Sequence, residues 1–463
     1  MRRGGRKQNT VLHMIAAVAF GVGPSVVLAQ QQQPSSPVSG SLQLSSSAEL
    51  DTNAGLAPTS PGARLKFSER IRVNVTSETS NQILRFTGSG WADVTFQPGG
   101  GTAFNFGNPN LRLSYNRDAA NAAFAGSADY WSGDIVSAYD IDPTAGVFLV
   151  VDDGTLTRTG VNVGVQTGLR APLGLSLDFI YDGVDYEGTT DPALFDTITA
   201  QYMAAADMRI SPVTQGRVSA GVVTYEDSAV PVALSTVTTS YDFAVTHELR
   251  RALTLDANIG VQEREVTSGG PLGTRTGMSG GVRATQLLPR GDVFAGVSFD
   301  ETGPANRTNL SFGHSLTLPA GSVSASLTAT DIQGHGVRLL GNASYSQQLS
   351  DGTFDMSLGQ SIGTNQLDED VLTTQFGVAY GQQVTAASDL NLSFNLTRTE
   401  DGGAGSAPTR SRATFTASYD QALTPEWDMS VGYRYRAFSS ETVSAANSNA
   451  IFLNLTRNID FGF

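Results

Sequence analysis

The side chains that could supply acid, base or nucleophile chemistry are few and scattered along the chain. The histidines are His13, His247, His314 and His335, and His314 has a serine beside it, in the stretch FGHSLTL. A histidine that deprotonates a serine is the nucleophile–base pair of many hydrolases. Residues around His314 alternate in polarity, however, and neighbours on a β-strand point to opposite faces. His314 and Ser315 therefore cannot form a dyad with each other, and we expect no enzyme.

Metal and cofactor chemistry is equally sparse. The chain has no cysteine, which excludes thiolate metal sites, cysteine nucleophiles and disulfides together. The acidic run Asp368-Glu369-Asp370 is more typical of a solvated loop than of a cation site. Asp152-Asp153-Gly154 is typical of a turn. We expect no metal site, no cofactor and no catalytic residue.

The overall charge excludes nucleic acid as a partner. The formal net charge is -14 and the sequence pI is about 4.7, whereas phosphate binding needs a basic surface. The lysines are Lys7 and Lys66, so a polybasic membrane-binding patch is also excluded. Charged residues make up 16% of the chain, which is low for a soluble protein of this size.

The elements that must carry these residues are β-strands with two unlike faces. In EWDMSVGYRYRAF, residues 426–438, apolar and polar side chains alternate with a period of two. The same alternation recurs in residues 253–261 and 389–396. The polar face holds mainly Ser, Thr, Asn, Gly and Asp with an occasional Arg, whereas the wet face of a soluble sandwich is rich in Lys and Glu. This composition indicates a confined, hydrated surface.

The connections between the strands alternate between two kinds. The tight ones are residues 171–174, 211–216, 249–252, 288–292, 318–321, 349–352 and 423–426. The longer ones, acidic or rich in Gly, are residues 226–235, 267–275, 301–306, 364–370 and 400–410. Short turns at one end and longer loops at the other are typical of outer-membrane β-barrels.

The sequence therefore predicts an all-β protein: a single closed antiparallel transmembrane barrel over residues 41–463. We expect about 22 strands, with a range of 20 to 24, from a spacing of about 20 residues per strand and connection. The least regular region is 131–157, which is compatible with a long loop, an extra hairpin or extended strands.

The first 29 residues have the pattern of a cleaved export signal. Arg2, Arg3, Arg6 and Lys7 precede the apolar run at 14–23, and small residues follow at the cleavage position. A membrane anchor is the alternative, but the apolar run is too short to span a bilayer. Residues 30–40 are polar and of low complexity, which predicts a disordered linker. We expect export through the periplasm to the bacterial outer membrane.

The last strand indicates how the barrel would be inserted. It reads NAIFLNLTRNIDFGF, and Ile459, Phe461 and Phe463 lie on its apolar face. A C-terminal aromatic on that face resembles the signal that the barrel-assembly machinery recognises. Arg457 falls on the same face, and we expect it to extend toward the periplasmic interface. The expected partners are this machinery, outer-membrane lipid and lipopolysaccharide.

The two strand faces then correspond to lipid and lumen. Trp427, Tyr433 and Tyr435 are expected in aromatic girdles at the bilayer interfaces. Charged residues on the opposite face are candidates for the lining of a pore. These candidates are Arg70, Arg72, Asp178, Asp256, Asp428, Arg434 and Arg436. Each of them could instead brace the wall in a cross-strand salt bridge, and the sequence favours neither role.

Part of the N-terminal third resembles a known family. Residues 44–62, 77–86 and 108–124 are similar to the opening strands of the beta-barrel porin 2 family of outer-membrane proteins. Leu50-Asp51-Thr52-Asn53 departs from the aromatic-Asp-Asp-Asn form usual there. The resemblance implies an outer-membrane barrel, often associated with exopolysaccharide or envelope systems, without catalytic residues.

The functional expectation is a porin-like channel for passive diffusion of small hydrophilic solutes. A TonB-dependent transporter would carry a plug domain ahead of its barrel, and an autotransporter would carry a passenger; neither fits the short stretch after the signal. The alternatives are a non-conducting structural or surface barrel and an outer-membrane conduit for exopolysaccharide export.

Overall fold

The computed structural model describes residues 38–135, 154–189, 194–228, 233–267, 271–301, 306–334, 336–364, 370–402, 408–441 and 444–462. The strands of the first half are β1 (Val38–Asp51), β2 (Arg64–Thr79), β3 (Gln82–Phe96), β4 (Thr102–Asp118), β5 (Ala122–Asp134), β6 (Thr155–Thr167), β7 (Leu173–Glu187), β8 (Thr197–Ser211), β9 (Thr214–Asp227), β10 (Ser235–Arg250) and β11 (Leu253–Thr267). Those of the second half are β12 (Pro271–Leu288), β13 (Gly291–Asp300), β14 (Arg307–Leu318), β15 (Gly321–Ile332), β16 (Gly336–Leu349), β17 (Gly352–Thr364), β18 (Asp370–Thr385), β19 (Ser388–Asp401), β20 (Arg410–Ala422), β21 (Trp427–Ser440) and β22 (Ala446–Gly462).

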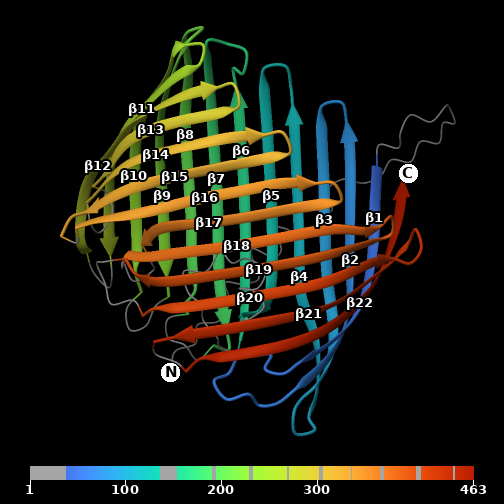
Figure 1. Cartoon of the computed structure of the whole chain (residues 1–463). Coiled ribbons are helices and arrows are strands. Elements are labelled where there is room, and N and C mark those ends of the chain that lie inside the picture. The colour runs from blue at the N-terminus through green and yellow to red at the C-terminus, as the bar shows by residue number, and fades with distance from the viewer. Residues whose placement is uncertain are drawn as a thin grey trace, which may run out of the picture. The chain divides into compact units, whose positions relative to one another are not determined.

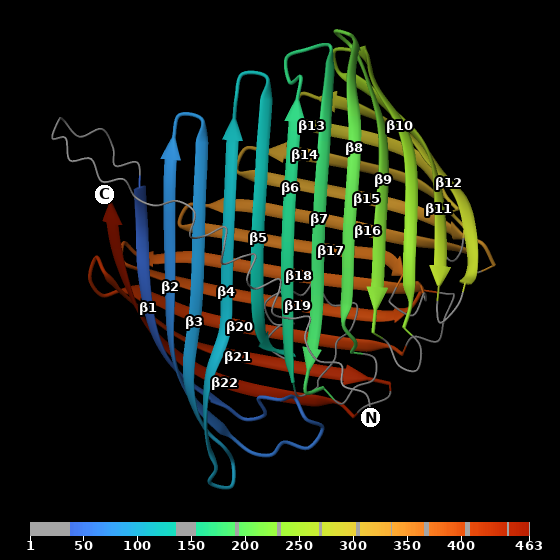
Figure 2. The ribbon, with the colours of Figure 1, turned by 180° about the vertical axis from the view of Figure 1, so that it is seen from behind.

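These strands form one closed antiparallel barrel. Each strand pairs with its neighbour in sequence, and β1 pairs with β22 from Ser39↔Gly462 to Asp51↔Ala450. The predicted fold class is confirmed, with 22 strands. The strands of the C-terminal half cross in front of the N-terminal strands in Figure 1 and behind them in Figure 2. The opposite walls of a barrel with tilted strands cross in this way.

The start of β1 and the end of β5 lie in the two stretches that the sequence predicted to be a linker and an irregular region. The barrel wall begins at Val38, inside the stretch predicted as linker, while the predicted signal lies outside the described residues. In the irregular region 131–157, β5 continues to Asp134 and pairs directly with β6 from Thr155. The two strands are therefore neighbours in the wall, without a further hairpin between them in the ladder.

The two ends of the barrel differ as the loop pattern predicts. At the turn end, β2 and β3 are joined by Ser80 and Asn81, and β14 and β15 by Pro319 and Ala320. At the loop end, residues 52–63 join β1 to β2. Among the described residues, no helix has the length and hydropathy to cross a membrane.

One face of the wall is apolar and open. Ile451 and Leu453 on β22 are 60% and 46% exposed, and Leu310 and Phe312 on β14 are 64% and 57% exposed. An outward-facing band of exposed apolar side chains is the lipid-facing surface of an outer-membrane barrel. This outer face is therefore the lipid-facing side, and the alternate residues form the lumen face.

The clusters of buried apolar residues lie at the loop end. Leu56 of the first loop packs with Phe438 of β21 and Ala446 of β22. A second cluster joins Ile135, Leu156 and Leu194. Both clusters lie where strands end and loops begin, so the packed apolar clusters of the described residues are at the loop end of the barrel rather than along its wall.

Candidate functional site: the lumen wall

The strand registers place all the predicted pore-lining residues on one face. Arg70 faces Ser45 across the β1–β2 ladder, and Arg434 faces Ala450 across the β21–β22 ladder. Residues that face each other in a ladder lie on the same side of the sheet. Followed around the closed barrel, these registers put Asp178, Asp256 and Asp428 on that side as well. Their alternation with the exposed apolar residues makes this the lumen face.

The arginines of β21 are held by carboxylates of β1. Arg434 Nη2 lies 2.8 Å from Glu49 Oε2, and Arg436 Nη2 lies 2.7 Å from Asp51 Oδ2. Both pairs reach past β22, which lies between the two strands. Side chains of non-adjacent strands meet this way on the concave side of a wall. The structure gives Arg434 and Arg436 the bracing role.

Asp51 is the centre of a buried polar network. Arg436 is 4% exposed and Asp51 is 1% exposed. The Asp51 carboxylate also accepts hydrogen bonds from the Ser448 hydroxyl and from the Asn53 backbone N–H, the latter at 2.8 Å. Asn53 Nδ2 in turn donates to the carbonyl of Ala57 at 2.8 Å. The network therefore ties the first loop to the seam between β1 and β22.

Each of the predicted aspartates has a neutral residue next to its carboxylate. Asp256 accepts a hydrogen bond from the Thr246 hydroxyl at 2.7 Å, and Asp428 accepts one from Asn458 Nδ2 at 3.0 Å. Asp178 lies over Gly164, where a Cβ would come within 2.9 Å of its Oδ1. Among the described residues no ion pair joins any of the three to a cation, although Arg283 faces Asp256 across the β11–β12 ladder.

Arg70 and Arg72 behave differently from the arginines of β21. Both are exposed on the lumen face of β2. Arg70 faces Ser45 and Trp91, and Arg72 faces Gln43 and Ser89. Within the described part of the chain neither forms an ion pair. They are the cations of this candidate set that remain available to a ligand.

The predicted girdle residues lie on the outer face. Trp427 begins β21 at the turn end, and the Arg457 guanidinium lies 5.7 Å from its ring centre. Tyr433, farther along the strand, is 37% exposed and donates its hydroxyl to Asn449 Oδ1 at 2.6 Å. Tyr435 follows on the same face, half-buried. Their outward direction is compatible with aromatic girdles, and the girdle assignment stays a prediction.

The C-terminal strand carries its apolar residues toward lipid. Ile459 faces Leu42 across the seam, and the ring of Phe461 lies over Gly40, where a Cβ would come within 2.5 Å of it. Phe463 lies outside the described residues. Arg457 Nη2 reaches Glu426 in the turn before β21, at 2.9 Å. Its guanidinium is thus directed toward the turn end, and extension to the periplasmic interface stays a prediction.

The histidine and serine that suggested hydrolysis do not meet. The ring Nδ1 of His314 is 2.9 Å from the backbone carbonyl of Asp292, while the Ser315 hydroxyl donates to the Asp292 carboxylate. His247 Nδ1 lies 2.9 Å from the Thr214 hydroxyl, and His335 lies outside the described residues. The described residues also contain no group of three or more His, Cys, Asp or Glu that could hold a metal ion.

Sequence reasoning missed the carboxylates that form ion pairs with Arg434 and Arg436 of β21. Glu49 and Asp51 are two residues apart at the end of β1, so the period-two pattern that selected Arg434 and Arg436 also puts them on one face. That signal was available. No sequence signal indicated their pairing with β21, because closure of the barrel brings together residues that are 385 positions apart.

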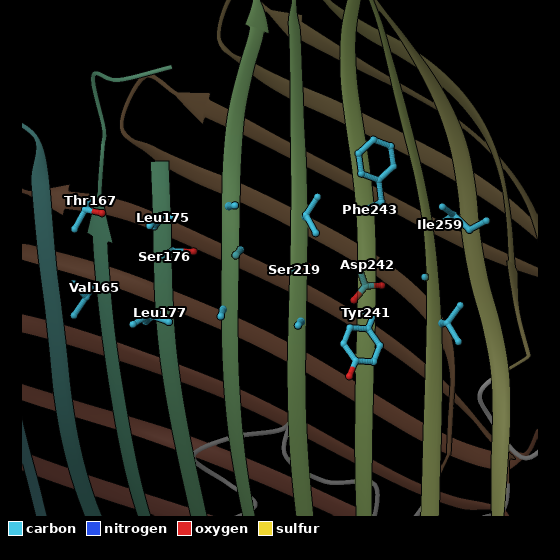
Figure 3. A pocket seen from close by; sticks show the side chains of 17 residues that line it. Val165, Thr167, Leu175, Ser176, Leu177, Ser219, Tyr241, Asp242, Phe243 and Ile259 are labelled. Atoms are coloured by element: carbon cyan, nitrogen blue, oxygen red, sulfur yellow. The ribbon is translucent and has the colours of Figure 1, made fainter. Parts of the chain in front are cut away.

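A hollow of about 740 Å³ lies on the outer face, over β6 to β11. Figure 3 shows it, with Leu177, Tyr241 and Phe243 among its lining side chains. The small residues Ala204 and Ala220 form its floor between those larger side chains. Because this surface faces hydrocarbon, the hollow does not open into the lumen.

The comparisons with solved structures find similar barrels at low sequence identity. A copper transporter, OprC, has a TM-score of 0.57 at 12% identity, over 93% of this chain and 82% of that one. The siderophore receptor PirA from Pseudomonas aeruginosa has a TM-score of 0.55 at 10% identity, over 92% and 81%. The ferric-catecholate import receptor Fiu from E. coli K12 has a TM-score of 0.57 at 10% identity, over 93% and 82%.

No protein-family model matches the chain, and no curated protein matches it. Membership of the beta-barrel porin 2 family therefore stays a prediction. The expectation of a passive porin-like channel is wrong, because the similar barrels are a transporter and receptors for particular ligands. A non-conducting surface barrel and a polysaccharide conduit do not fit these neighbours either. The chain has the outer-membrane β-barrel fold, similar to that of TonB-dependent receptors.

Proposed function

We propose that this chain is a receptor-type transport barrel of the outer membrane, which binds a particular ligand at its lumen face and passes it inward. The observation that carries this is the closed ring of 22 strands, matched over 93% of the chain by a copper transporter and by a ferric-catecholate import receptor. Barrels of this strand number are too wide to be filled by their own side chains, and transporters of that size control the lumen by other means.

The charges on the lumen wall support selective ligand binding rather than a non-selective channel. It presents discrete charges, some locked in ion pairs such as Arg434–Glu49 and some exposed such as Arg70 and Arg72. Fixed, unequal charges discriminate among solutes by sign and shape. The outward position of Ile459 and Phe461 on β22 supports insertion through the barrel-assembly machinery into a lipopolysaccharide-bearing membrane.

Ligand selectivity of the full chain tests this proposal. The refolded protein in detergent is titrated calorimetrically with Cu²⁺ and with ferric tris-catecholate, and in liposomes it is assayed for uptake of uncharged sugars of increasing size. We expect saturable binding of at least one metal-bearing ligand. Absence of saturable binding, together with sugar uptake that depends only on solute size, would overturn the proposal.

A further inference from the structure

We propose that four arginines on the lumen face of β2, β3 and β4 form an anion-binding ladder for a multivalent oxyanion, one that carries phosphate or carboxylate groups. These residues, called the arginine ladder below, are Arg70, Arg72, Arg112 and Arg85. The inference rests on the proposed function and names the charge class of the ligand that the wall would take.

The ladder is defined by the strand registers. Each arginine occupies a different lumen row, and the rows begin on β1. The row of Ser45 contains Arg70, and that of Gln43 contains Arg72. The row of Ser41 runs through Asn74 and Thr87 to Arg112, and that of Ser39 runs through Thr76 to Arg85. Successive rows therefore each supply one guanidinium.

The rows descend toward the turn end of the barrel. On β1 they run from Ser45 back to Ser39, near the start of the strand at Val38. Residues two apart on a strand are separated by roughly 7 Å along it. Arg70 and Arg72, two apart on β2, could therefore contact one oxyanion together, and Arg112 and Arg85 lie further along the same face on β4 and β3.

The wall around the ladder offers hydrogen bonds, and its carboxylates on the lumen face are Asp129 opposite Arg112, with Glu78 and Asp93 one row from Arg85 and Arg70. The residues directly beside the four arginines in their rows are neutral, apart from Asp129 beside Arg112. These neighbours are Ser45, Trp91, Gln43, Ser89, Thr87, Thr76 and Ser114. Guanidinium groups with neighbouring hydroxyl and amide donors are suited to phosphate and carboxylate recognition.

Several other lumen cations are neutralised by carboxylates of the protein. Lys66 Nζ lies 2.7 Å from Asp93, and Arg217 Nη1 lies 3.3 Å from Asp207. In the part of the chain that the structure describes, none of the ladder arginines forms such an ion pair, and all four are exposed. A row of like charges without counter-ions on a confined wall is stabilised by a multivalent anion.

Calorimetric titration with pyrophosphate at low ionic strength tests the ladder, with citrate as the carboxylate arm. The full chain with Arg70→Gln and Arg72→Gln should bind at least tenfold more weakly than the parent, and Arg70→Lys with Arg72→Lys should recover part of the loss. The matched control is Arg217→Gln, which removes a lumen arginine already paired with Asp207 and should change the Kd less than twofold. Comparison of the two anions tells a phosphate site from a carboxylate site.

Folding of each variant is checked by its heat-modifiable migration on gels. Equal affinity in the parent and the Arg70→Gln/Arg72→Gln variant, or no saturable binding of either anion to the parent, would overturn the ladder. Those results would leave the proposed function standing if the parent still bound a metal-bearing ligand. Failure of the proposed function has its own signature, which is size-dependent uptake without saturable binding.

Discussion

At the scale of single residues, ion pairs on the lumen face divide by burial. Arg436 and Asp51 are almost completely buried, with side-chain exposures of 5% and 1%, whereas Arg217 and Asp207 are 43% and 51% exposed. Exposed pairs contribute little because water and salt screen them. Removing one partner of a buried pair leaves an uncompensated charge, which is far more costly.

We therefore expect Arg436→Gln to lower the free energy of unfolding by about 3 to 5 kcal/mol. The physical reason is that the Asp51 carboxylate would lose its counter-charge while Ser448 and Asn53 still enclose it. Urea titration of the protein in lipid vesicles measures the change. Arg217→Gln is the control and should cost about 1 kcal/mol or less. Equal effects of the two substitutions would contradict the bracing role.

At the scale of the element, the outer face of β2 contains a carboxylate among apolar residues. Glu69 lies between Phe67 and Ile71 on that face, which are 45% and 47% exposed. The Ser46 hydroxyl donates to its Oε2 at 2.7 Å. Unlike Arg457, which reaches Glu426 in a turn, Glu69 has no cation paired with it among the described residues. A charge at such a position destabilises a barrel in its membrane.

The substitution Glu69→Leu should therefore raise the free energy of unfolding by about 1 to 2 kcal/mol, since it removes a charge from the lipid-facing band. Urea titration in vesicles checks it. Glu69→Gln serves as the control, because it removes the charge but retains a hydrogen-bond partner for Ser46, and it should fall between the parent and Glu69→Leu. A loss of stability in Glu69→Leu would show that the carboxylate stabilises the wall.

At the scale of the whole molecule, the seam between β1 and β22 decides whether a barrel exists. Every other ladder joins strands that are consecutive in sequence, while this one joins the two ends of the barrel. A closed wall leaves no unpaired backbone in hydrocarbon. The seam is also where the buried Asp51 network lies, so closure and rim packing stabilise each other.

A cysteine pair across the seam tests the closure and its register. The chain has no native cysteine, and Ser47 faces Asn454 directly. Directly facing residues have Cα atoms about 4.5 to 5.5 Å apart, within disulfide reach. The variant Ser47→Cys/Asn454→Cys should therefore form a disulfide in vesicles, seen as a band that does not unfold fully on gels until it is reduced. Ser47→Cys/Phe452→Cys, offset by two residues, should not; an equal yield in both would contradict the register.

The sequence alone determined the wall of this protein. Alternation in stretches such as residues 426–438 is local, because successive side chains of a strand point to opposite faces, and so it predicted the strand number, the closed barrel and the faces of Arg70, Trp427 and Ile459. Only the tertiary structure decided which charges are neutralised. Asp51 meets Arg436 because closure brings distant residues together, and local alternation is blind to that. The same alternation builds passive and receptor-type barrels alike, so the passive function we inferred from it was wrong. The residue pattern of the wall therefore specifies which side chains surround the lumen, whereas the pairing of those side chains follows from contacts between strands that are distant in sequence.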